Sequence, residues 1–176
     1  MLPPTLMGYI HYARGGIAAD PNVAIDEYQT TAEWAKMAGN HLGAQRVTQL
    51  IADLKAAHAA PADALDIHIH YLMELPSHGT TFYTWLTIRS LILPLAELGA
   101  YEELAVLAGA LKPSPLKLDR AARAAIIKAR DNLGDRLFEI ASERGSTFDP
   151  AGARRYIIES WRRMTADRTK ADVANH

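Results

Sequence analysis

The central stretch of the chain, residues 81–111, restricts the fold more than any other segment. It contains two apolar runs separated by Gly99 and Ala100. In the first run, apolar side chains recur at helical spacing and others cover the remaining sides: Phe82, Trp85, Ile88, Ile92 and Leu95, with Leu86, Leu91, Leu93 and Leu98. Because a helix that is apolar almost all round is buried between neighbours, we expect other helices on both flanks of this one.

Helical signals also cover the rest of the chain. The first helix carries Leu6, Tyr9, Ile10 and Ala13 as its apolar residues, and Asp20-Pro21 and Asp149-Pro150 are typical helix starts. Pro94 lies inside the central helix and should bend it, since proline lacks the N–H that would bond Ser90. No segment alternates with a period of two, so we expect no sheet. The sequence predicts an all-α fold, with one domain over residues 1–166 and a flexible tail over 167–176.

Three small residues open successive helices at nearly equal intervals. Ala24, Ala64 and Ala105 lie 40 and 41 residues apart, and each of their helices follows another apolar helix. Such a period is typical of α-solenoids and is longer than the ~34 residues of a tetratricopeptide repeat (TPR). The prediction is a TPR-like α-solenoid of antiparallel helix pairs, about three pairs followed by C-terminal helices. An irregular helical bundle is the alternative in a chain so rich in alanine.

Two segments resemble a known family. The first contains Trp85-Leu86-Thr87-Ile88-Arg89, then Leu98-Gly99, then Ala105-Val106-Leu107-Ala108-Gly109-Ala110; the second runs from Asp119 to Gly145 and contains Leu133-Gly134. In this order they are similar to the TPR-like C-terminal region of large bacterial LuxR-type and AfsR-like multidomain regulators. These are signalling ATPase regulators, and some are linked to adenylate-cyclase-like domains. The resemblance implies a sensor or binding scaffold in a transcription-regulatory setting, since this sequence contains no phosphate loop.

Composition and charge narrow the class of protein further. The chain has no cysteine, no basic and apolar leader and no run approaching the ~18 apolar residues of a membrane span. We therefore expect a cytoplasmic protein that has no membrane partner. Residues 1–111 carry 5 Lys and Arg against 11 Asp and Glu, whereas residues 112–170 carry 14 against 8. Solvated faces of opposite sign explain this asymmetry; a basic end that meets an acidic partner is the alternative.

No catalytic or metal-binding pattern is found in the sequence. His68 and His70 are two residues apart, so on a helix they point to different faces and do not bind one ion together. The motifs His-Glu-x-x-His, Gly-x-Ser-x-Gly and Gly-x-Gly-x-x-Gly do not occur. We expect a protein that is not an enzyme and that has no cofactor and no metal.

The predicted function is binding of a protein or peptide partner. Solenoids of paired helices offer a concave groove. The first helices of the pairs would line it through these residues: His11, Tyr12, Gln45, Gln49, Trp85 and Arg89. Arg89 would need a carboxylate partner such as Glu97, Asp66 or Glu103, or a bound anion. Uncovered apolar surface at the ends of so short an array predicts a homodimer or a contact through one end.

Two other functions remain open. A small-molecule sensor would have an apolar pocket between the central and C-terminal helices, near Tyr83, Trp85, Arg89 and Phe138. Nucleic-acid binding, the less favoured alternative, would use a basic stripe on the last helix, formed by Arg154, Arg155, Arg162 and Arg163. The chain as a whole is not basic, which argues against that use.

Overall fold

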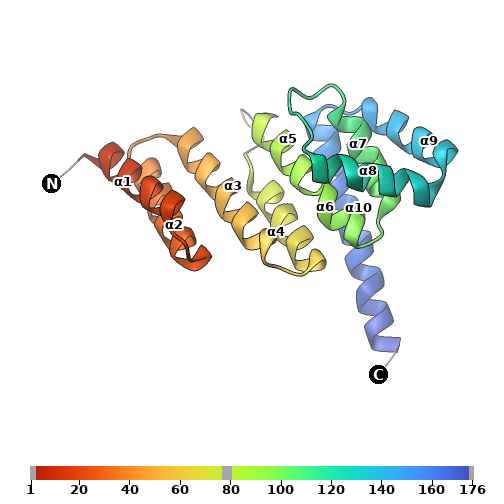
Figure 1. Ribbon diagram of the computed structural model, residues 1–176, viewed down its shortest axis with the longest axis horizontal. Coiled ribbons are helices and arrows are strands. Elements are labelled where there is room, and N and C mark those ends of the chain that lie inside the picture. The colour runs from red at the N-terminus through yellow and green to blue at the C-terminus, as the bar shows by residue number, and fades with distance from the viewer. Residues whose placement is uncertain (1–2, 77–80, 175–176) are drawn as a thin grey trace. The chain divides into compact units, whose positions relative to one another are not determined.

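The computed structural model describes the backbone of residues 3–76 and 81–174, and these residues form helices with no strand among them (Figure 1). The all-α prediction is therefore confirmed. The helices are α1 (Pro4–Ile17), α2 (Pro21–Met37), α3 (His41–Ala57), α4 (Pro61–Glu74), α5 (Thr81–Ser90), α6 (Ile92–Glu97), α7 (Tyr101–Leu111), α8 (Arg120–Leu133), α9 (Asp135–Ser146) and α10 (Pro150–Ala174).

The helices divide into two compact units. Unit 1 is Met1–Ile67 and unit 2 is His68–His176, so the division falls within α4. The sequence predicted one domain over residues 1–166, and that assignment stays a prediction beside this division. α10 continues as a helix to Ala174, beyond the start of the expected tail at residue 167; residues 175 and 176 of that tail lie outside the described residues.

In unit 1, α2 packs against both α1 and α3 (Figure 1). The expected start of α2 is confirmed, because the Asp20 side chain accepts a hydrogen bond from the Asn22 N–H at 2.8 Å and Pro21 is the first helical residue. One buried cluster of this unit is half alanine: Ala24, Tyr28, Ala32 and Val47, with Ala18, Leu50, Ile51 and Leu54 partly buried against it.

The face that α1 turns toward α2 includes two buried glycines. Gly8 and Gly15 are buried there, and a Cβ atom on Gly15 would lie only 2.7 Å from the Tyr28 ring. Leu6 and Tyr9, which belong to the apolar stripe of this helix, are exposed instead. The Tyr28 ring occupies the space beside α1, so only glycine fits at position 15.

In unit 2, α7 is the most deeply buried helix. All of its residues from Leu104 to Leu111 are buried, and it packs against α5, α6, α8, α9 and α10. The central helix is interrupted at Leu91, three residues before Pro94: α5 ends at Ser90 and α6 begins at Ile92.

Helices α7 and α9 approach each other until their backbones touch. A Cβ atom on Gly109 would lie 1.9 Å from the Ser142 carbonyl oxygen, and one on Gly145 would lie 1.8 Å from the Val106 carbonyl oxygen. Both distances are far inside van der Waals contact. Only glycine permits this approach at either position.

The three alanines that suggested a repeat lie in α2, α4 and α7. Ala24, Ala64 and Ala105 are 4%, 7% and 0% exposed, and each lies within the first five residues of its helix. The all-helical order of elements is consistent with an α-solenoid, and the TPR-like pairing of the helices stays a prediction.

Candidate functional site

A groove with a volume of about 260 Å³ opens in unit 1. It lies along α1 and α3 and includes the C-terminal half of α2. Its lining residues are Pro4, Thr5, Gly8, Tyr9 and Tyr12 on α1, Thr31, Ala35 and Ala38 at α2, and Asn40, Gly43, Arg46 and Val47 at α3.

Helical spacing explains which side chains reach the groove. On α1, Thr5, Tyr9 and Tyr12 follow one another at intervals of four and three residues, so they share a face. Residues without bulky side chains, such as Gly8 and Ala35, leave the space open. Tyr9 and Tyr12 remain 68% and 42% exposed, so their rings are available to a ligand.

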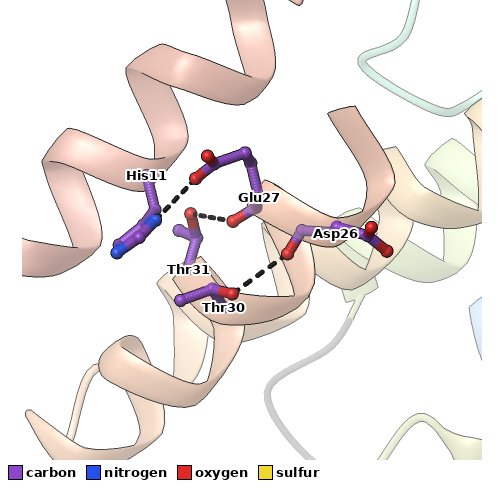
Figure 2. Close-up of polar contacts among 5 residues, drawn as sticks. All are labelled: His11, Asp26, Glu27, Thr30 and Thr31. Atoms are coloured by element: carbon purple, nitrogen blue, oxygen red, sulfur yellow. Dashed lines mark hydrogen bonds and ion pairs between the residues drawn. The ribbon is translucent and has the colours of Figure 1, made fainter. Parts of the chain in front are cut away.

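A polar contact fixes α1 against α2 beside the groove. Figure 2 shows the His11 ring pointing toward Glu27, with Nδ1 2.5 Å from Oε2. One turn further along α2, the Thr31 hydroxyl donates to the Glu27 carbonyl oxygen at 2.9 Å, and the Thr30 hydroxyl donates to the carbonyl oxygen of Asp26 at 3.1 Å (Figure 2). Because His11 directly precedes Tyr12 on α1, this contact also holds the two tyrosines of the lining, Tyr9 and Tyr12, in position.

The N-terminal turns of α3 supply the remaining residues of the groove lining. The Asn40 side chain accepts a hydrogen bond from the Gly43 N–H at 2.8 Å and so caps the helix. Arg46 and Val47 lie one turn further along the same helix. The cap therefore positions the turn from which Arg46 reaches the groove.

Arg46 is the only Lys, Arg, Asp or Glu residue in this lining. Within the part of the chain that the structure describes, it makes no hydrogen bond and no ion pair, and it is exposed. Residues 1–67 carry seven Asp and Glu against four Lys and Arg, yet no acidic side chain lines the groove. The groove is thus a locally cationic and aromatic site within an acidic unit.

Tyr28 lies beneath this site. Its ring centroid is 5.7 Å from that of Tyr12. Burial raises the pKa of the Tyr28 phenol above 10.0, the neighbouring Tyr12 raises it further, and the positive charge of Arg46 acts in the opposite direction. Tyr28 therefore remains neutral under Tyr12 at any physiological pH.

Of the residues predicted to bind a partner, Tyr12 lines the groove. Gln45 precedes Arg46 but is not part of the lining, and it is half-buried. Gln49 is fully buried, and its amide donates to the Asp53 carboxylate at 2.9 Å. Gln49 therefore contributes to the inside of the protein rather than to the groove surface.

The binding residues predicted on or near the central helix belong to unit 2, and none of them lines the groove. Trp85 and Phe138 are buried at 6% and 3% exposure. Tyr83 is half-buried, with its ring edge-to-face against Phe82 at 5.6 Å. Arg89 donates to the Lys117 carbonyl oxygen at 3.5 Å, and among the described residues of unit 2 no ion pair joins it to Glu97 or Glu103.

Sequence reasoning missed three groove residues that the structure brings together: Tyr9, Asn40 and Arg46. Tyr9 was assigned to an apolar stripe. The interval of three residues between Tyr9 and Tyr12 is the one signal that could have placed both on a common face. Nothing in the sequence relates Arg46 to these tyrosines, because they meet only through the packing of α1 and α3 around α2.

Some of the arginines of the basic helix α10 form hydrogen bonds within the protein. Arg154 donates to the carbonyl oxygens of Met73 and Leu75 at 3.2 and 2.9 Å, and Arg163 donates to the Ser160 hydroxyl at 2.9 Å. Arg155 and Arg162 are exposed. Two arginines of the four in the expected basic stripe are therefore engaged in contacts inside unit 2.

His68 and His70 differ in environment. His68 is buried, whereas His70 is exposed and its ring lies edge-to-face with Trp161 at a centroid distance of 5.5 Å. In the described ranges, no three His, Asp or Glu side chains are grouped so that they could hold a metal ion. Nor is any helix in those ranges both long and apolar enough to cross a membrane.

Comparison with protein-family models, with curated proteins and with solved structures found no match for this chain.

Proposed function

We propose that this chain is a non-enzymatic, TPR-like helical-repeat module of the cytoplasm that binds a protein or peptide segment in the groove of unit 1. The segment carries bulky apolar side chains and a carboxylate. The resemblance of residues 85–145 to the helical region of bacterial multidomain regulators suggests a transcription-regulatory or signalling setting.

The observation that carries this proposal is the combination of Tyr9, Tyr12 and Arg46 in one open groove. A volume of about 260 Å³ suits the insertion of a few side chains and is too small for a whole helix. Tyrosine supplies a large contact area at low entropic cost, and arginine forms paired hydrogen bonds to carboxylates. Tyrosine and arginine are also among the residues that contribute most to binding at protein interfaces.

The test is a selection of binding peptides from a random display library on the full chain, followed by titration of the selected peptides. Tyr12→Ala and Arg46→Ala should each weaken binding about tenfold or more, and Arg46→Glu should weaken it further when the peptide is acidic. Arg14→Ala is the matched control, since Arg14 is an exposed arginine of the same unit outside the lining. Equal affinity of all four variants would disprove binding at this groove.

A small carboxylic acid is the second candidate ligand, because the groove volume lies just under the ~300 Å³ at which small-molecule pockets begin. Benzoate and phenylacetate are suitable probes in a thermal-shift assay. Under this alternative they raise the melting temperature of the wild type and leave that of Arg46→Ala unchanged. Under the main proposal the selected peptides raise it and these acids do not.

A further inference from the structure

We propose that the outward face of α1, the face turned away from α2, is the contact surface for a second copy of this chain. The central row of this face is Leu6, Ile10, Ala13 and Ile17. This inference does not depend on ligand binding in the groove.

The outward face carries the large apolar side chains of α1. Leu6 and Ile17 are 44% and 84% exposed, Ala13 is exposed as well, and Ile10 between them is half-buried. The face toward α2 is occupied by Gly8 and Gly15 instead. An amphipathic helix normally buries its apolar stripe, so this helix has an apolar face that no other helix of unit 1 covers among the described residues.

The charged side chains of α1 lie outside this row, so the same row of a second copy can pack against it. None of the four row residues is ionisable. Arg14 lies to one side of the row, and His11 points the other way, to Glu27 of α2. A second copy would therefore bring no unpaired charge into the centre of the contact, which avoids the large cost of burying one.

The spacing of the row fits a two-fold contact. The intervals between Leu6, Ile10, Ala13 and Ile17 are four, three and four residues, so the row reads the same in both directions. A two-fold interface requires such self-complementarity. If residue i of one copy contacts residue j of the other, then residue j of the first copy contacts residue i of the second. With the axis between positions 11 and 12, two antiparallel α1 helices place Leu6 against Ile17 of the second copy, and Ile10 against Ala13 of the second copy.

Helix geometry also makes the pairing sterically suitable. In this register each Ile10 faces Ala13 of the second copy. The small alanine lets the two helices approach closely, and the Ile10 side chain fills the space beside it. The row runs along about three turns of α1 on each copy. Stable dimers bury on the order of 1,000 Å² or more in total, so exposed residues that flank the row, such as Tyr9, must also take part in the contact.

Sedimentation velocity of the full chain tests the assembly. Between about 1 and 100 µM the wild type should have twice the chain mass of 19.3 kDa, with dissociation on dilution. Leu6→Glu and Ile17→Glu should each weaken the dimer at least about tenfold, because they bury a carboxylate in the contact. Ile127→Glu is the matched control, since Ile127 is 60% exposed in unit 2. A wild type that is monomeric at every concentration would overturn the proposal.

Single cysteines test the register, because the chain has no cysteine of its own. In the antiparallel pair the two Ala13 positions lie about 4.5 Å apart along the helix axes, whereas the two Ile17 positions lie about 16.5 Å apart. Ala13→Cys should therefore form a disulfide-linked dimer under mild oxidation, and Ile17→Cys should not. Efficient cross-linking of both variants would indicate a parallel pair, and cross-linking of neither would exclude the contact; either result contradicts the proposal.

Discussion

At the scale of single residues, two glycines determine the distance between α7 and α9. Gly109 and Gly145 lie where the backbone of one helix meets the backbone of the other, at positions where a Cβ atom would overlap a carbonyl oxygen. Alanine has a higher helix propensity than glycine, so these positions are occupied against local preference. The close approach of the two helices is what requires glycine there.

Gly109→Ala is expected to lower the free energy of unfolding by about 2–3 kcal/mol, because a Cβ atom 1.9 Å from the Ser142 oxygen forces the helices apart. Urea denaturation followed by circular dichroism measures the change. Gly16→Ala is the control: its Cβ would lie 3.7 Å from the Tyr28 hydroxyl, so stability should be unchanged or rise by up to about 1 kcal/mol. Equal stability of Gly109→Ala and the wild type would refute the contact.

Tyr28 gives a prediction about alkaline pH. Its pKa is raised above 10.0 by burial and then by Tyr12, so the folded state holds the phenol proton more tightly than the unfolded state does. The resulting stabilisation is complete below about pH 10 and is lost as the pH rises through the folded-state pKa. The free energy of unfolding of Tyr28→Phe should therefore fall less steeply above pH 10 than that of the wild type. Parallel curves for the two proteins would contradict the raised pKa.

At the scale of elements, Arg154 joins α10 to the end of α4. Its guanidinium donates to the carbonyl oxygens of Met73 and Leu75, which are among the acceptors that a helix C-terminus leaves without intrahelical partners. Arginine suits this place because its planar group presents several donors at once. This residue, which the sequence suggested for nucleic-acid contact, therefore completes a helix end.

Arg154→Ala should lower the free energy of unfolding by about 1–2 kcal/mol, since it removes two charge-assisted hydrogen bonds from a half-buried position. Arg155→Ala, at the exposed neighbouring position, should change it by no more than about 0.5 kcal/mol. Thermal and urea unfolding of the two variants provide the comparison. If both variants lost the same stability, the effect would come from the charge of α10 rather than from the end of α4.

At the scale of the whole molecule, the two units differ in the size of their cores. The core of unit 1 includes Ala24 and Ala32 with Tyr28 and Val47, whereas in unit 2 all residues of α7 from Leu104 to Leu111 are buried. Larger buried apolar area gives greater resistance to local opening. Unit 2 should therefore be the more stable part of the chain.

Hydrogen exchange measured by mass spectrometry should show this difference as slower exchange in α7 than in α2. The variant Gly109→Ala should accelerate exchange in α7 and leave α2 close to its wild-type rate, because the substituted contact lies entirely in unit 2. Equal acceleration in both helices would show that the two units open as one.

The sequence by itself determined the helices and several of the positions at which they begin or end. Asp20-Pro21 starts α2, Pro94 interrupts the central helix, and Ala24, Ala64 and Ala105 are buried near the starts of their helices. These features depend on neighbours along the chain: capping, ring geometry and helical periodicity act within a few residues. For that reason they could be predicted without knowledge of the packing.

Only the tertiary structure decided which surfaces these helices present. Of the groove residues, Tyr12 was expected from the sequence, while Arg46 joins it because α1 and α3 both pack on α2. Likewise α1 turns its glycines inward because the Tyr28 ring fills the space beside it. Such outcomes depend on side chains that are distant in sequence and meet only in the folded protein, so no local pattern contains them.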